Sequence, residues 1–169
     1  MKENIVLIGM PGCGKTTVGK KLARLAGMVF LDLDAEIEKA AGCSIPQIFE
    51  TQGEGEFRRL ETLCAKKAAQ LKGRVVACGG GIVLREENMA ALKETGVIVF
   101  LDRKVSDICS SNLSGRPLIA GDLSRVQALY DQRIGLYRKY AEITVDCSCT
   151  PEEAAQKVRE LMQKREECK

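Results

Sequence analysis

The sequence predicts an α/β fold in which helices cover a sheet of parallel strands. Short apolar runs rich in valine and isoleucine recur along the 169 residues without clear alternation, which is typical of strands buried on both faces. Segments with helical periodicity separate these runs. Because strands and helices alternate and no linker or repeat interrupts them, we expect one domain over residues 1–169 with a substantial core.

Five apolar runs are the predicted strands, in chain order Ile5–Ile8, Val29–Leu33, Arg74–Cys78, Val97–Leu101 and Glu142–Val145. Between them, apolar residues at helical spacing mark one face of each predicted helix. These faces comprise Val18, Leu22 and Leu25; then Phe57, Leu60, Cys64 and Leu71; and then Leu123, Val126, Tyr130 and Tyr137.

Capping signals mark where helices begin. The stretch Thr150–Glu153 fits a capping box with proline at the first helical position, and the stretch Ser44–Gln47 fits a second such start. Asp34 is placed to cap a further helix that continues through Ile37.

The composition argues against several kinds of partner. The net charge is only +3, aromatic residues make up 4% of the chain and tryptophan is absent, so we expect no nucleic acid partner. No apolar run approaches the ~20 residues that span a bilayer, so we expect no membrane partner. The first predicted strand begins at Ile5, which leaves no room for a signal peptide and predicts a cytoplasmic protein.

Cysteine and histidine usage limits the available chemistry. The chain has eight cysteines but no C-x-x-C pair and no histidine, so a zinc site is not expected. We expect the cysteines to be reduced, structural thiols. Any general base must then be a carboxylate, unless the mechanism needs little base catalysis.

The stretch Gly9–Thr16 carries the most specific motif, because it fits the phosphate-binding pattern G-x-x-x-x-G-K-[ST] between a predicted strand and a predicted helix. Its glycines allow backbone N–H groups to turn toward phosphate oxygens, and the helix N-terminus adds positive potential. Lys15 would reach the outer phosphates and the Thr16 hydroxyl would bind magnesium. An ordinary glycine turn is the alternative. The expected nucleotide-binding residues are Gly12, Cys13, Gly14, Lys15, Thr16 and Thr17.

Two carboxylates, Asp32 and Asp34, stand at the end of the second predicted strand, where parallel strands face their ligands. Alternation along an extended strand would place both on one side. One could hold magnesium directly or through water, and the other could accept a substrate hydroxyl and align or deprotonate it. A helix start is the alternative interpretation of this D-x-D pattern.

Glycines and arginines complete the candidate site. Gly79, Gly80 and Gly81 follow the third predicted strand and permit close approach of a ligand, although a flexible turn is the alternative. Arg58, Arg59, Arg116 and Arg133 could together clamp anionic groups, whereas each alone is more typical of a solvated surface.

One segment, Ser106–Ser124, does not fit the alternation of strands and helices. It contains Ser-Ser-Asn, Ser-Gly, Arg-Pro and Gly-Asp, which is the chemistry of turns. A long polar loop after a late strand of a nucleotide-binding domain is a candidate lid, and a mobile surface connection is the alternative.

Taken together, these pieces resemble shikimate kinase over nearly the whole chain. The matching pieces are Gly9–Thr16, Leu31–Asp34, Ser44-Ile45 with Ile48-Phe49, Gly55–Arg58 with Glu61, Gly79–Gly81, Arg116–Leu118, and Arg133 with Leu136-Tyr137. The resemblance implies a three-layer, nucleoside-monophosphate-kinase-like P-loop fold with a five-stranded parallel sheet. It implies magnesium- and ATP-dependent phosphorylation of the 3-hydroxyl of shikimate, a step toward chorismate and the aromatic amino acids. The partners are then ATP and shikimate, and a monomer is expected.

The resemblance also implies roles for single residues on the nucleotide side. Lys15 contacts the transferred phosphate, Thr16 coordinates magnesium and Asp32 belongs to the outer shell of the metal. Arg116 closes over the phosphates as part of a lid at residues 106–124. Lys15, Arg116 and the candidate base Asp34 are the implied catalytic residues.

On the substrate side, the resemblance implies a binding segment over residues 33–61. Asp34 holds the shikimate hydroxyls, while Arg58 and Arg133 bind the carboxylate. Glu61 orients Arg58, and the glycines Gly79–Gly81 meet the substrate through their backbone.

The chain departs from the family pattern at two places. Many relatives carry an arginine against adenine about seven or eight residues before the lid arginine, where this chain has Cys109-Ser110-Ser111-Asn112. Gly135 stands where many relatives have proline, which we expect to affect only local helix geometry.

Three other functions compete with this interpretation. A gluconate kinase of the same architecture would give no reason for both Arg58 and Arg133 beside Asp34. A GTPase-like switch would need N-K-x-D and D-x-x-G motifs, which are absent. A catalytically silent phosphate-loop protein could still retain the motif residues.

Overall fold

A parallel sheet forms the centre of the protein. The computed structural model describes residues 3–110 and 123–168, and within these residues five parallel strands form one sheet in the order β2-β3-β1-β4-β5. The strands are β1 (Asn4–Ile8), β2 (Val29–Asp32), β3 (Arg74–Ala77), β4 (Gly96–Asp102) and β5 (Ile143–Asp146). The predicted α/β class and the five-stranded parallel sheet are therefore confirmed.

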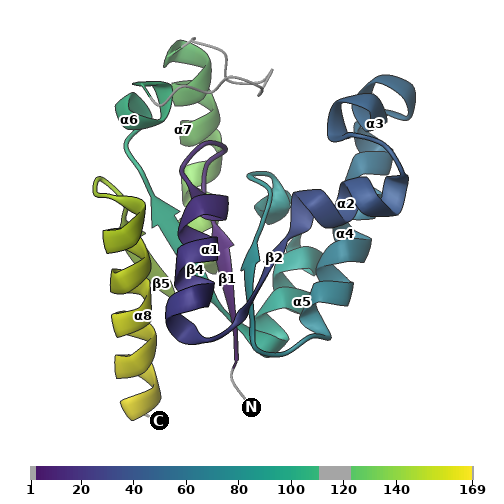
Figure 1. Cartoon of the computed structure of the whole chain (residues 1–169). Coiled ribbons are helices and arrows are strands. Elements are labelled where there is room, and N and C mark those ends of the chain that lie inside the picture. Colours follow the sequence, from purple (N-terminus) through teal and green to yellow (C-terminus); the bar gives the residue numbers. More distant parts are fainter. Residues whose placement is uncertain (1–2, 111–122, 169) are drawn as a thin grey trace.

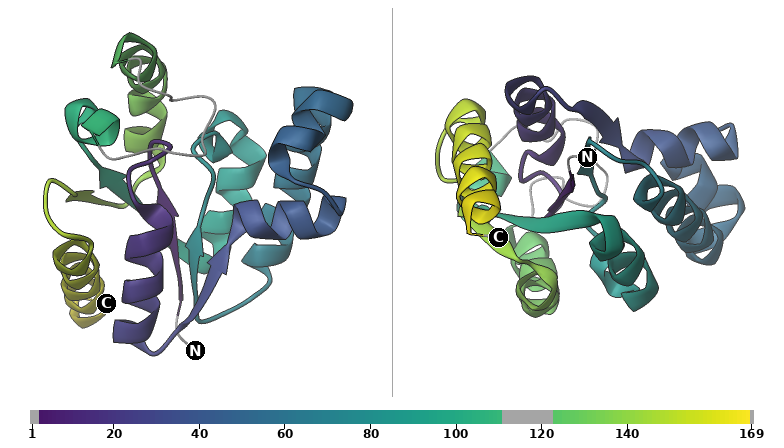
Figure 2. Two further views of the ribbon diagram at one scale, coloured as in Figure 1. Left: turned by 45° about the horizontal axis from the view of Figure 1, so that its top comes forward. Right: turned by 90° about the horizontal axis from the view of Figure 1, so that it is seen from below.

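Helices cover both faces of this sheet and produce three layers. Figure 2 shows α1 (Lys15–Ala26) and α8 (Pro151–Glu167) on one face, with α5 (Glu86–Thr95) and α7 (Leu123–Tyr140) on the other. Beyond the β2 edge, α2 (Leu33–Ala41), α3 (Ile45–Thr51) and α4 (Gly53–Ala69) form an arm that rises beside the sheet in Figure 1. Two short helices, η1 (Ile82–Leu84) and α6 (Val105–Ser110), follow β3 and β4.

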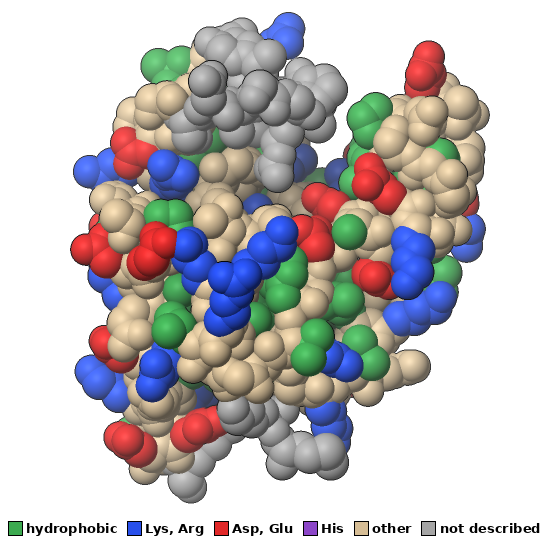
Figure 3. All heavy atoms as spheres, viewed as in Figure 1, with side chains coloured by type: hydrophobic (Ala, Val, Ile, Leu, Met, Phe, Trp, Pro, Cys, Tyr) green, Lys and Arg blue, Asp and Glu red, His purple; other side chains and the backbone are tan. Residues whose placement is uncertain are grey.

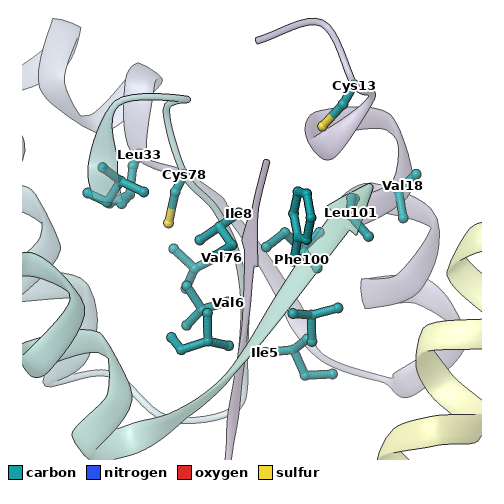
Figure 4. Close-up of a cluster of buried hydrophobic side chains, with 14 of the residues drawn as sticks. Ile5, Val6, Ile8, Cys13, Val18, Leu33, Val76, Cys78, Phe100 and Leu101 are labelled. Atoms are coloured by element: carbon teal, nitrogen blue, oxygen red, sulfur yellow. The ribbon is translucent and has the colours of Figure 1, made fainter. Parts of the chain in front are cut away.

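The core lies around the central strands. Every residue of β1 is buried, as is all of β4 except Asp102. Figure 4 shows apolar side chains such as Val6, Ile8 and Val76 packed along these strands. Burial on both faces explains why these strands show apolar runs rather than alternation.

Helix starts follow the predicted capping chemistry at two places. The Ser44 hydroxyl accepts from the Gln47 N–H and the Thr150 hydroxyl accepts from the Glu153 N–H, and both form complete capping boxes with proline in the first turn. Helix α1 differs, because its N-cap is Gly14 in the left-handed region (φ 98°) with no side-chain hydrogen bond. The first N–H groups of α1 therefore lack a side-chain partner at the cap and can serve a ligand.

The D-x-D segment folds differently from the strand alternation that we predicted. Strand β2 ends at Asp32, and Leu33 already belongs to α2. The N-cap is Asp32 rather than Asp34, because an Asp32 carboxylate oxygen accepts the Asp34 N–H at 3.1 Å. The argument that Asp32 and Asp34 share one side of an extended strand is therefore wrong.

Three predicted core positions are exposed instead. Leu25 is 43% exposed, Leu71 lies beyond the end of α4 and is 38% exposed, and Leu123 is 56% exposed. Each lies in the last or first turn of its helix or beyond it, where the chain leaves the core.

The polar segment predicted as a loop over 106–124 is partly helical. Residues 106–110 belong to α6, and residues 123–124 begin α7. The rest of this segment, including Arg116, lies outside the described residues.

Two further observations concern the whole described chain. All eight cysteines are free thiols, and Cys13, Cys64, Cys78 and Cys147 are buried. Among the described residues, no helix has the length and apolar character that crossing a bilayer demands.

Two glycines inside helices should respond in opposite ways to replacement by alanine. In Gly19→Ala the new Cβ would lie 2.6 Å from the Phe30 ring and 3.2 Å from Leu7, so crowding should lower the free energy of unfolding by about 1–3 kcal/mol. In Gly135→Ala nothing lies within 4 Å of the new Cβ, and better helix propensity should raise that free energy by about 0.5–1 kcal/mol. Urea titration of both variants measures the difference. A stabilised Gly19→Ala would contradict this account of how α1 packs on the sheet.

Candidate active site

The candidate site lies at the carboxyl edge of the sheet, where three loops meet. The phosphate loop follows β1, the start of α2 follows β2, and the glycine turn Gly79–Gly81 follows β3. Because β3 lies between β2 and β1, these loops are neighbours in space. Figure 3 shows the molecule hollowed at this edge, between the arm of α2–α4 and the rest of the protein. Such an edge is where open parallel sheets bind ligands.

Glycine conformation sets the shape of the phosphate loop. Gly9, Gly12 and Gly14 have φ values of 148°, 80° and 98°, and no other residue type in the described chain has positive φ. A Cβ at Gly9 would lie 2.7 Å from the backbone oxygen of Leu101, so a side chain there would also clash with β4. The loop therefore keeps its curve only with these glycines.

The Lys15 ammonium lies inside the curve of the loop. Its Nζ donates to the backbone oxygens of Gly9 and Met10 at 2.8 and 2.7 Å, and it lies 3.7 Å from the Cys13 Sγ. Lys15 as a whole residue is 7% exposed, so its charge is held in a partly desolvated position. Together with the free N–H groups of α1, this cation favours an anionic ligand.

Asp32 links the phosphate loop to α2. One of its carboxylate oxygens accepts the Thr16 hydroxyl at 2.9 Å, while the other caps α2. A hydroxyl and a carboxylate, both oxygen donors, suit Mg²⁺, which keeps several waters and binds through one or two carboxylates and substrate phosphates. Over the described residues no cluster of three acidic or cysteine side chains surrounds a metal position.

Arg58 lies between two carboxylates and the glycine turn. Its Nη1 donates to the buried Glu61 at 2.8 Å, and its Nε and Nη2 donate to the exposed Glu54 at 3.3 and 3.2 Å. A Cβ at Gly81 would overlap the Arg58 Nη1, so the guanidinium packs directly against this glycine. The Arg58 side chain is 13% exposed.

Asp34 and Glu61 approach the neighbouring glycine. A Cβ at Gly79 would lie 2.8 Å from one Asp34 carboxylate oxygen and 3.4 Å from a Glu61 oxygen that has no hydrogen-bond partner. Burial raises the pKa of Glu61, with a smaller contribution from the Asp34 charge, while the Arg58 hydrogen bond and charge oppose this shift. Asp34, Glu61 and Arg58 therefore surround the first and last residues of the glycine turn.

The middle glycine connects the site to α7 and to the phosphate loop. The Gly80 backbone oxygen accepts the Tyr137 hydroxyl at 2.7 Å. A Cβ at Gly80 would lie 2.6 Å from the Pro11 ring, so the turn also touches the phosphate loop. Burial raises the pKa of Tyr137, and the positive charge of the nearby Arg133 acts in the opposite direction.

The predicted site residues thus fall into three groups. Most of them lie around one edge of the sheet, namely the phosphate loop, Thr17 at the start of α1, Asp32, Asp34, Arg58 and the glycine turn. Arg133 lies on α7 one helical turn before Tyr137, whose hydroxyl contacts the glycine turn. Arg59 does not join them, because its side chain is 63% exposed and pairs with Glu56 at 2.7 Å. Arg116 lies outside the described residues.

Two residues contribute to the site without a local sequence motif that predicts this role. Pro11 is only a variable position of the phosphate-loop motif, yet its ring packs against Gly80. Helical spacing predicts Tyr137 on an apolar helix face, whereas its hydroxyl reaches the glycine turn. The signal was the residue type, because a buried tyrosine needs a hydrogen-bond partner where phenylalanine would not.

A second depression lies away from this site. It is a groove of about 640 Å³ between α1 and α8, lined by the stems of charged residues such as Arg24 and Lys157 and crossed by the Lys21–Glu152 ion pair. It shares no residue with the candidate site.

Comparisons with known proteins point to one family. The shikimate kinase family model matches residues 11–163. A shikimate kinase of Caldanaerobacter subterraneus subsp. tengcongensis is 43% identical over 161 residues, covering 92% of this chain and 94% of that relative. One from Thermodesulfovibrio yellowstonii is 43% identical over 162 residues, covering 92% of each chain.

Solved structures agree with these relatives. A shikimate kinase from Acinetobacter baumannii, in complex with shikimate, superposes with a TM-score of 0.92 at 36% identity, covering 98% of this chain and 95% of that one. A gluconokinase from Sinorhizobium meliloti has a TM-score of 0.61 at 17% identity, covering 96% of this chain and 92% of that one, and this likeness concerns the fold alone.

The raised pKa of Glu61 predicts how its contribution to stability depends on pH. An acid whose pKa is higher in the folded state binds protons more tightly when folded, so its contribution falls as pH rises from its ordinary pKa, 4.5, to the folded value. We therefore expect the free energy of unfolding of the wild type, relative to Glu61→Gln, to decrease over this interval. Urea unfolding at a series of pH values measures it.

Glu56→Gln is the matched control on the same helix. The hydrogen bond from Arg59 lowers the pKa of Glu56, so its contribution should instead be lost as pH falls. If both carboxylates changed the free energy of unfolding with pH in the same direction, burial would not be what controls the pKa of Glu61.

Proposed function

Because the chain belongs to the shikimate kinase family, we propose that it transfers the γ-phosphoryl group of ATP to the 3-hydroxyl of shikimate, which yields shikimate 3-phosphate and ADP. This reaction is a step toward chorismate and the aromatic amino acids. The observation that carries the proposal is the glycine turn, around which a phosphate loop, a carboxylate and an arginine meet within one site. Phosphoryl transfer needs a phosphate cradle, an aligned hydroxyl and a substrate held in line.

On the nucleotide side, the phosphate loop binds ATP through backbone N–H groups and the N-terminus of α1. Lys15 then acts on the transferred phosphoryl group, where its charge stabilises the transition state. Thr16 and Asp32 would hold Mg²⁺, Thr16 directly and Asp32 in the outer shell, and the ion would neutralise phosphate charge. The 2.9 Å contact between the Thr16 hydroxyl and Asp32 supports this pairing.

On the substrate side, Asp34 accepts the 3-hydroxyl proton or aligns that hydroxyl. The chain has no histidine, so a carboxylate is the group available for this task. The position of Asp34 supports the role, because its side chain faces Gly79 while Asp32 turns toward Thr16.

Arg58 and Arg133 bind the shikimate carboxylate, and Gly79–Gly81 meet the substrate through their backbone. The surroundings of Arg58 support this role. Its partner Glu61 is buried and close, whereas Glu54 is 65% exposed and pairs at 3.2 Å with the opposite edge of the guanidinium. Exposed ion pairs stabilise little, so a substrate carboxylate can replace Glu54 while Glu61 keeps Arg58 in place.

Several further features belong to this proposal. The chain acts as one domain over residues 1–169 and as a monomer, with a substrate-binding segment over 33–61 and a lid over 106–124 that brings Arg116 to the phosphates. We propose the cytoplasm as its location, which the eight free thiols favour. Without the additional arginine of many relatives near Cys109, adenine contacts must come from other residues.

The reaction itself gives the first test. Purified protein should release ADP from ATP only when shikimate is present, and EDTA should stop the release because the phosphates need Mg²⁺. Gluconate and nucleoside monophosphates should support little turnover. Faster turnover with either of these acceptors than with shikimate would show that the substrate assignment is wrong.

The carboxylate clamp gives a second test. Losing one partner of a buried charge pair typically costs about 2–5 kcal/mol, so Arg58→Ala or Arg133→Ala should lower kcat/KM for shikimate at least roughly thirtyfold. The loss should lie mainly in the KM for shikimate, while the KM for ATP should change little. Steady-state kinetics with each substrate varied in turn measure both.

Two controls separate the clamp from general damage. Arg59→Ala removes an exposed arginine next to Arg58 and should leave both KM values unchanged. Arg58→Lys keeps a positive charge beside Glu61 but loses the planar fork, so it should still weaken shikimate binding. If a shikimate analogue without the carboxylate lost as much activity as shikimate in the Arg58 and Arg133 variants, these arginines would not bind the carboxylate.

A further inference from the structure

Tyr137 is the largest fully buried side chain of the described residues, and it joins the core to the active site. Its ring stacks on Phe100 of β4, with ring centroids 5.2 Å apart and an interplanar angle of 17°. The opposite end of the side chain, the hydroxyl, reaches the glycine turn and donates to the Gly80 backbone oxygen at 2.7 Å. One residue of α7 thus contacts both the centre of the sheet and a loop of the site.

The hydroxyl of Tyr137 needs an explanation, because phenylalanine would fill the same core space. A buried hydroxyl is costly unless it is hydrogen-bonded, and here its partner is the backbone of a substrate-binding turn. Arg133 stands one helical turn earlier on the same face of α7, and its positive charge lowers the pKa of Tyr137 against the larger, raising effect of burial. The hydroxyl therefore contacts Gly80 and lies within the electrostatic influence of Arg133.

The position of the glycine turn matters for every group around it. Gly80 packs against Pro11 of the phosphate loop, and Gly81 packs against the Arg58 guanidinium. A shift of this turn would change the spacing between Arg58 and the phosphate loop, while release of Arg133 would change the other half of the clamp. Small displacements of this kind reduce rates strongly, because reacting groups must meet in line.

We propose that Tyr137 is a positioning residue for the acceptor substrate, whose hydroxyl fixes the Gly80 carbonyl on one side and Arg133 on the other. This inference rests on the proposed function of the site. Tyr137 acts through the turn and through Arg133 rather than on the reacting atoms. Its hydrogen bond holds α7, the glycine turn and the phosphate loop at a fixed spacing.

The test is Tyr137→Phe, which removes the hydroxyl and keeps the ring on Phe100. We expect the KM for shikimate to rise about tenfold or more and kcat to fall, because Gly80 and Arg133 lose their common partner, one hydrogen bond being worth about a factor of ten. The KM for ATP should stay within about twofold of the wild type, since the phosphate loop keeps its own hydrogen bonds. For a shikimate analogue without the carboxylate, Tyr137→Phe should lower kcat/KM by a smaller factor than for shikimate.

Tyr130→Phe is the matched control on the same helix. The Tyr130 hydroxyl donates to an Asp102 carboxylate oxygen at 3.3 Å, at the end of β4. Its removal should leave the KM for shikimate within about twofold of the wild type. In the Arg133→Ala background, Tyr137→Phe should raise the KM for shikimate by a smaller factor than in the wild type, because part of its effect depends on Arg133.

Three results would overturn the inference. They are a Tyr137→Phe variant with wild-type kinetics, equal increases of the KM values for ATP and shikimate, and a variant so unstable in thermal melts that the hydroxyl is needed for folding itself. A wild type that fails to phosphorylate shikimate would instead overturn the proposed function, so the two failures are distinguishable.

Discussion

The absence of side chains at Gly79–Gly81 is the constraint on which the site depends. A Cβ at each of these positions would lie within 2.8 Å of an atom from another element: Asp34 of α2, Pro11 of the phosphate loop and Arg58 of α4. Three parts of the chain far apart in sequence therefore approach one turn at van der Waals distance. The glycines matter here through close packing rather than through flexibility, because none of the three has a positive φ.

Charge is arranged around this turn so that one edge of Arg58 is fixed and the other is exchangeable. Glu61 is almost fully buried, and burial raises its pKa because it disfavours the ionised carboxylate. The hydrogen bond and positive charge of Arg58 stabilise that ionised form. Breaking such a pair is costly because it leaves an uncompensated buried charge, and this cost keeps Arg58 in position. Glu54 on the opposite edge is exposed to water, which weakens its hold. A buried carboxylate can thus orient the Arg58 guanidinium through Nη1 without using the donors Nε and Nη2.

The sequence predicted the sheet and the phosphate loop because both are local. An apolar run or a glycine motif depends on neighbouring residues, and the five strands lie where those runs occur. Periodicity failed near helix ends, where Leu25 and Leu71 continue the pattern although the chain has left the core. The prediction that Asp32 and Asp34 lie on one side of an extended strand failed for a related reason, since Asp32 ends the strand by capping α2. The contact between Tyr137 and Gly80 joins residues 57 positions apart, and no local pattern contains it.

The fold alone does not determine which acceptor is phosphorylated. A gluconokinase of 17% identity covers 96% of this chain with a TM-score of 0.61, so the sheet and its helices serve more than one kinase. The side chains that we propose for binding the acceptor lie on α2, α4 and α7 rather than on the central strands. The glycine turn is where those helices meet the phosphate loop. In the proposed site, substrate choice and phosphate geometry are therefore coupled through contacts at one loop, and we expect a substitution there to disturb both.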